Sequence, residues 1–119
     1  MNKEKLLERY GKGERDFEGV DLEWANLEGA DLTRANLSGA NLSGAYLWGA
    51  NLSGSNLSGS NLKGADLSGS NLWGANLSGS NLEGADFSGA SIEGADIEGA
   101  KMDFGGTVFL LAKEKTESA

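Results

Sequence analysis

The sequence repeats every five residues over most of its length. Between residues 35 and 84 it reads ANLSG ANLSG AYLWG ANLSG SNLSG SNLKG ADLSG SNLWG ANLSG SNLEG. An α-helix repeats its faces every 3.6 residues and a β-strand every two, so a period of five fits neither over any length. Each repeat must therefore contain a change of chain direction.

Each repeat combines a minimal strand with a turn. The first three residues, typically Ala-Asn-Leu, place a small and an apolar side chain on the inward face and a polar side chain on the outward face. The remaining Ser-Gly predicts a turn, because a type II turn needs positive φ at its third residue and glycine adopts it at little cost. Three turns lack this glycine, at Trp24, Arg34 and Phe104. We expect these corners to have another turn type or to adopt positive φ at a cost.

The A(N/D)LXX register closely resembles that of the pentapeptide-repeat proteins. The opening LLERYGKGERDFEGVDL also resembles the start of cyanobacterial members of that family. The resemblance implies an all-β fold, a right-handed quadrilateral parallel β-helix whose coils of about 20 residues rise by about 4.8 Å. Closure after four repeats rather than three is implied by the resemblance, since the spacing alone leaves the number open.

The register divides the chain into three segments. Residues 1–14 are expected to form a capping helix, because helix formers follow Asn2 as a possible N-cap and Leu6, Leu7 and Tyr10 lie within one turn of each other. Residues 15–104 are expected to form the β-helix, with 18 uninterrupted repeats. Residues 105–119 are expected to provide an apolar C-terminal cap and a polar tail, and the pattern leaves open whether the cap is strand or helix.

The inward positions predict the core. The inward Ser55, Ser60, Ser70 and Ser80 replace Ala and need hydrogen-bond partners, which corner carbonyl and amide groups can supply. The outward Asn residues form columns that can build side-chain amide ladders and support the stack, Asn36, Asn56 and Asn76 on one side and Asn41, Asn61 and Asn81 on another. The central residues assigned to the core are Leu22, Leu27, Leu32, Leu37, Leu42, Leu47, Leu52, Leu57, Leu62, Leu67, Leu72, Leu77, Leu82, Phe87, Ile92 and Ile97.

Composition excludes several classes of function. The chain has no Cys and no His, so disulfides, thiolate or imidazole metal sites, and catalysis that depends on either residue are unavailable. Ca²⁺ sites need several oxygens from a shaped loop and paired catalytic carboxylates need a cleft, and a convex rod offers neither, so we expect no cofactor, no metal and no enzyme activity. The net charge of −8 argues against direct nucleic-acid binding. No apolar run is long enough to cross a bilayer or to form a signal peptide, so the sequence predicts a cytoplasmic protein that does not enter membranes.

Charge is concentrated at the two ends of the expected column. Between residues 35 and 82 only Lys63 and Asp66 are charged. Some members of the resembled family act on DNA gyrase by presenting a duplex-shaped acidic rod, and such mimicry needs charge continuously along one face. A non-catalytic structural or protein-interaction module of unknown partner, monomeric or weakly dimeric, is therefore the preferred function. The alternative is a DNA-mimicking inhibitor or protector of gyrase.

Four aromatic residues are the candidates for partner binding. Tyr46 and Trp48 flank the central Leu47 and should both point outward. Trp24 should lie one coil below, near the preceding corner, and Trp73 on the next side, one coil further on. Exposed aromatic residues on a Ser, Asn and Gly surface indicate contact with a partner, with chance exposure and self-association as competing interpretations. The partner would be another protein, bound on the side of Tyr46 and Trp48 with Trp24 at its edge.

Overall fold

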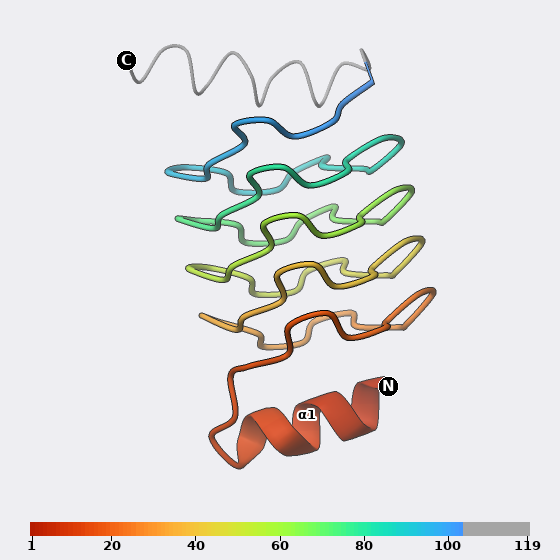
Figure 1. Ribbon diagram of the computed structural model, residues 1–119, viewed down its shortest axis with the longest axis vertical. Helices are drawn as coiled ribbons and strands as arrows, with labels where there is room; N and C mark the ends of the chain where they lie inside the picture. The colour runs from red at the N-terminus through yellow and green to blue at the C-terminus, as the bar shows by residue number, and fades with distance from the viewer. Residues whose placement is uncertain (104–119) are drawn as a thin grey trace.

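The computed structural model describes residues 1–103. Phe104 and the expected C-terminal cap lie outside the described residues. The described chain is one helix, α1 (Lys3–Gly11), followed by a stack of coils (Figure 1). Parallel bridges join residues of successive coils, always 20 positions apart, from Asp16↔Asn36 to Asn81↔Lys101. Four repeats thus complete one coil, and the fold is a four-sided β-helix of five-residue repeats.

We name the four sides by their central residues, because each side continues from coil to coil. Side A carries Leu37 and Leu57, and side B carries Leu42 and Leu62. Side C comprises residues 25–29, 45–49, 65–69 and 85–89, and side D follows it with Leu52 and Leu72.

Each side is shorter than the minimal strand expected from the sequence. Within residues 1–103 a repeat contributes one bridge residue, and no longer strand is present. The cause is the turn, which begins already at the central residue: the Ala25 N–H donates to the Leu22 carbonyl at 3.0 Å, and the same bond recurs in every following repeat up to Ala100 and Ile97. Only the second residue is left in an extended ladder.

The corners keep one conformation whether or not they contain glycine. Gly44 has φ of 66°, and Trp24 and Arg34 have φ of 62° and 60°. Of the two outcomes expected for corners without glycine, these two therefore adopt positive φ rather than another turn type. A side chain in that region costs roughly 1–2 kcal/mol, because Cβ crowds the backbone.

The backbone hydrogen bonds explain the Asn or Asp at the second position. In the repeat 40–44, the N–H groups of Asn41, Leu42 and Gly44 donate to neighbouring coils at 2.9, 2.7 and 2.9 Å, and Ala40 closes the turn. The remaining N–H, of Ser43, donates to Asn41 Oδ1 at 3.1 Å. The side chain at the second position thus supplies the acceptor that the backbone does not.

Amide ladders between coils are therefore not the main role of these Asn side chains. Their oxygen atoms turn back to their own repeats instead of bridging the coils. Side-chain bonds join the columns where Asp lies in the first coil, from Asn36 Nδ2 to Asp16 at 3.2 Å and from Asn41 Nδ2 to Asp21 at 3.3 Å.

The core is a column of leucines. Central side chains from Phe17 to Leu82 are at most 1% exposed, and burial of each contributes roughly 1.5–3 kcal/mol. Ile92, assigned to the core from the sequence, is only partly buried, because it lies in the last coil and no described coil covers it on side D.

The inward serines differ from one another. Ser55, Ser70 and Ser80 donate their hydroxyls to the carbonyl of the leucine three residues earlier, at 2.6, 2.7 and 2.6 Å. The Ser60 hydroxyl is buried and has no partner.

α1 lies across the first coil (Figure 1). The Asn2 side chain accepts from the Lys5 N–H at 2.9 Å and caps the helix. Leu6 is fully buried, and Leu7 and Tyr10 pack against the core. The helix therefore closes the apolar end of the column.

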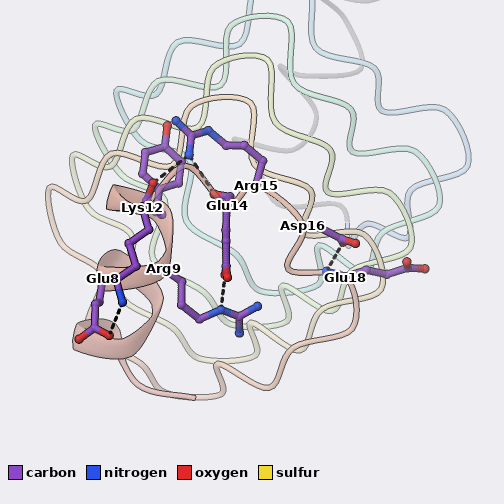
Figure 2. A network of polar contacts seen from close by, with 8 residues as sticks. Glu8, Arg9, Lys12, Glu14, Arg15, Asp16 and Glu18 are labelled. Carbon is purple, nitrogen blue, oxygen red and sulfur yellow. Dashed lines mark hydrogen bonds and ion pairs between the residues drawn. The ribbon is translucent and has the colours of Figure 1, made fainter.

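The N-terminal segment also supplies donors to the first coil, whose carbonyls have no coil beneath them. The N-terminal ammonium donates to the Asp21 carbonyl at 3.1 Å, Lys3 Nζ to the Glu28 carbonyl at 3.4 Å, and the Tyr10 hydroxyl to the Thr33 carbonyl at 2.8 Å. Figure 2 shows the ion pair of Arg9 with Glu14 at the same end. These contacts block the edge on which another chain could otherwise add.

Candidate interaction surface

The four aromatic candidates are all exposed. Trp24 is 66% exposed, Tyr46 49%, Trp48 55% and Trp73 61%. Apart from Met1, they are the large apolar side chains that lie open to solvent within residues 1–103.

Tyr46 and Trp48 lie on side C, and Trp24 ends a repeat of side B at the corner where side C begins. The six-membered ring of Trp24 lies against Gly44 in the coil above, since a Cβ built at Gly44 would be 2.3 Å from Trp24 Cζ3. Gly44 is consequently buried, whereas the other corner glycines of residues 15–103 are exposed. Tyr46 and Trp48 follow Gly44 directly along side C, so Trp24 lies at the edge of their side.

Trp48 leans toward the next coil, and Trp73 lies apart. Trp48 Nε1 would be 3.8 Å from a Cβ built at Gly69. Trp73 lies on side D, in line with Thr33 and Ser53 of the coils below. The structure thus places Trp24 at the corner between sides B and C, Tyr46 and Trp48 on side C, and Trp73 on side D. We call the first three the aromatic strip.

Carboxylates lie next to the aromatic strip on both sides. Asp66 forms the bridge directly above Tyr46, and Asp86 lies above Asp66 in the same column. Glu28 lies one coil below Trp48, since the Gly29 N–H donates to the Trp48 carbonyl at 2.9 Å. The surface of side C is therefore aromatic in the middle and acidic above and below.

Hydrogen bonding keeps two aspartates ionised. The Ser88 hydroxyl and N–H hold the pKa of Asp86 below its ordinary value. The Thr33 hydroxyl and N–H lower the pKa of Asp31 on side D in the same way, and Arg15 adds a smaller effect.

Tyr46 leaves one backbone N–H without the hydrogen bond that neighbouring repeats make, which the sequence prediction missed. It occupies the position where Asn or Asp captures the N–H two residues later, and its side chain has no acceptor in reach of the Trp48 N–H. Neighbouring repeats on side C show the missing bond, from Glu28 N–H to Asn26 at 3.2 Å and from Ser68 N–H to Asp66 at 3.0 Å. A tyrosine in an Asn column was the available signal.

The described residues also bear on metal binding and membrane insertion. Within residues 1–103 no three acidic residues are grouped so that they could hold a metal ion. Nor does that part of the chain contain a helix of sufficient length and apolar character to span a bilayer.

Comparison with known proteins gives the family. Residues 16–47, 35–74 and 65–103 match the family described as pentapeptide repeats, in 8 copies. The chain belongs to this family. No curated protein sequence matches it.

Solved structures of the same family are similar to the chain. A pentapeptide repeat protein from Nostoc Pcc 7120 is 33% identical, with 92% of this chain and 93% of that chain covered and a TM-score of 0.47. Rfr23 from the cyanobacterium Cyanothece 51142 is 32% identical over 85% of this chain and 95% of its own, with a TM-score of 0.48. A pentapeptide repeat protein from the Arabidopsis thaliana thylakoid lumen is 38% identical over 71% and 63%, with a TM-score of 0.42.

Proposed function

We propose that this protein is a non-catalytic interaction module that binds another protein through the aromatic strip on side C. The observation that carries the proposal is the exposure of Trp24, Tyr46 and Trp48 on a surface otherwise made of polar and acidic residues. Tyr and Trp bury large areas with few rotamers to immobilise, and they dominate binding hot spots.

The rest of the surface offers few features by which a partner could recognise one position over another. Inward positions are occupied by the core, and corner glycines offer no side chain. The Asn oxygens are already bonded within their own repeats, for example from Ser58 N–H to Asn56 at 2.9 Å. The same Asn and Ser side chains recur on sides A, B and D, so they provide no unique address.

A pull-down with matched variants tests the proposal. Tyr46→Asn with Trp48→Ser restores the commonest repeat residues and should leave the fold intact while removing partner binding. Trp73→Ser, which removes an equally exposed indole from side D, is the control and should bind as the parent does. Equal capture of a partner by the parent and the double variant would place the binding site elsewhere.

The acidic end coils favour a second candidate, DNA mimicry directed at gyrase. Asp16, Glu18 and Asp21 at one end and Asp96 and Glu98 at the other give the column its negative charge. Such mimicry would also use the right-handed winding that the family resemblance implies and that we propose for this chain. The neutral middle, from residue 35 to residue 82, opposes it. Inhibition of gyrase supercoiling at micromolar protein would reverse our order of preference.

A further inference from the structure

We infer that side C recognises a cationic partner segment, an extended stretch containing Arg or Lys. The inference rests on the function proposed above and names the chemistry of the partner. It is carried by the combination of exposed aromatic residues, flanking carboxylates and the absence of Lys and Arg from the described repeats of this side.

Side C differs from the other three sides in its charge. Its described repeats contain Glu28, Asp66 and Asp86 and no Lys or Arg. Each remaining side carries at least one cationic residue within residues 15–103: Arg15 on side A, Lys63 and Lys101 on side B, and Arg34 on side D. Side C therefore presents the one uniformly negative side around the middle of the column.

The aspartates of side C retain capacity for a ligand. Asp66 Oδ1 accepts from the Ser68 N–H at 3.0 Å and from the Ser68 hydroxyl at 2.5 Å, which leaves Oδ2 for another donor. Asp86 Oδ1 likewise accepts from the Ser88 N–H at 2.9 Å. These bonds fix the carboxylates in place and keep Asp86 ionised, so that an incoming guanidinium or ammonium meets an oriented acceptor.

Of the three carboxylates, Glu28 is the least favourable acceptor for a cationic partner. Its side chain is exposed, and the Lys3 ammonium lies at the same residue, donating to the Glu28 carbonyl at 3.4 Å. The Lys3 ammonium therefore places a positive charge near Glu28, which opposes an incoming cation. We therefore assign the larger share of the charge recognition to Asp66 and Asp86.

The aromatic strip suits the same ligand. Arg and Lys stack on Trp and Tyr faces, and Arg does so more often because its guanidinium is planar and weakly hydrated. The chain contains this contact already: the Arg15 guanidinium lies 3.6 Å from the centre of the Tyr10 ring, close to the network of Figure 2. Tyr46 and Trp48 are each about half exposed, so part of each ring is open to a cation.

The dimensions favour a short extended segment over a second copy of this chain. From Glu28 to Asp86 the side rises by three coils, about 14 Å, which four or five extended residues span at about 3.3 Å each. A second copy would bring another chain of net charge −8 to an acidic face.

Binding of a basic peptide tests the inference. The probe is a labelled peptide, acetyl-Gly-Arg-Gly-Arg-Gly-Arg-Gly-amide, titrated with the full chain and followed by fluorescence anisotropy. We expect saturable binding that weakens at about 1 M salt, where the Debye length falls to about 3 Å. Tyr46→Asn with Trp48→Ser should weaken it by about tenfold, whereas Trp73→Ser should not change it.

A charge-matched pair of variants separates recognition from general attraction. The triple variant Glu28→Ser, Asp66→Asn, Asp86→Asn removes three carboxylates from side C, and Asn preserves the bonds to Ser68 and Ser88. The control triple variant Glu18→Ser, Glu93→Ser, Glu98→Ser removes three carboxylates from sides A and D. A loss of about tenfold or more in the first and little change in the second would support the inference.

Three results would overturn it. Equal losses in both triple variants would mean that the peptide responds only to net charge. Binding of an acidic peptide or of a neutral oligosaccharide such as cellohexaose in place of the basic one would assign side C to another ligand. Absence of peptide binding, with partner capture still abolished by the Tyr46 and Trp48 substitutions, would refute the cationic ligand and leave the proposed function standing.

Discussion

Ser60→Ala should stabilise this protein, although it deletes a polar group from a well-packed column. Ser60 is 1% exposed, and its hydroxyl has no hydrogen-bond partner. Ser80, which stacks directly above it on side B, is equally buried and donates to the Leu77 carbonyl at 2.6 Å. The two residues thus differ in one hydrogen bond and little else.

The magnitude follows from that difference. A buried hydroxyl without a partner costs roughly 1–3 kcal/mol relative to its hydration in water, and alanine at residue 60 removes the cost. Ala40 occupies the same position one coil below, so the backbone already accommodates this residue. Ser80→Ala removes a hydrogen bond whose net contribution, with desolvation of the hydroxyl already included, is about 0.5–1.5 kcal/mol, so it should lower the stability by about that amount.

Urea unfolding of the two alanine variants checks the argument. With an m-value of about 1–3 kcal/mol/M, a gain of about 1.5 kcal/mol raises the midpoint by roughly 0.5–1.5 M at unchanged slope. Ser60→Ala should show this rise, and Ser80→Ala should have a midpoint below that of the parent. A lower midpoint for Ser60→Ala, or equal shifts for both variants, would refute the reasoning.

Three further predictions follow from the repeat. Leu57→Lys buries an unpaired charge in the middle coil and should prevent folding, whereas Ser58→Lys, one residue on and partly exposed, should leave the thermal midpoint almost unchanged; equal tolerance in circular dichroism melts would mean that the register is wrong. Tyr46→Asn supplies the acceptor for the Trp48 N–H and should raise the unfolding free energy by about 1 kcal/mol in urea titrations, and no gain over Tyr46→Ala would contradict this. The pKa values of Asp31 and Asp86 are lowered in the folded state, so their contribution is present above the unfolded value of about 3.9 and is lost as the pH falls through the folded value. The stability difference between the parent and the Asp31→Asn, Asp86→Asn variant should therefore shrink on acidification below about pH 4, and a difference that does not change with pH would count against it.

Much of the fold could be predicted because each repeat is a local solution. The glycine at the fifth position indicates positive φ, and the central leucine indicates the inward face, whatever the distant parts of the chain do. The number of repeats in a coil could not be predicted in this way, because it depends on the angle turned at each corner. The family resemblance supplied it, and the 20-residue spacing of the bridges confirmed it.

Other features depend on atoms that belong to neighbouring coils or on a rotamer. Ser60 and Ser80 stand in identical repeat positions, so no sequence pattern distinguishes the satisfied hydroxyl from the unsatisfied one. The role of Asn41 could have been predicted by counting the N–H groups of one repeat against their acceptors, which shows one donor too many. The cover of Gly44 by Trp24 required both the coil length and the direction of the indole.

Stability alone does not account for the residues that form the aromatic strip. Trp24 holds positive φ where glycine would do so without strain, and Tyr46 forgoes a hydrogen bond that asparagine makes elsewhere in the same column. Departure from the repeat is not sufficient evidence of a binding site, because Arg34 adopts the same positive φ at another corner. Trp24 and Tyr46 differ from Arg34 because each also leaves a large apolar side chain open to solvent. Trp24 is 66% exposed and Tyr46 is 49% exposed. In the folded chain each of these two residues therefore carries two costs, one from its backbone conformation or missing hydrogen bond and one from exposed apolar surface. Contact of the strip with a partner would recover the second cost.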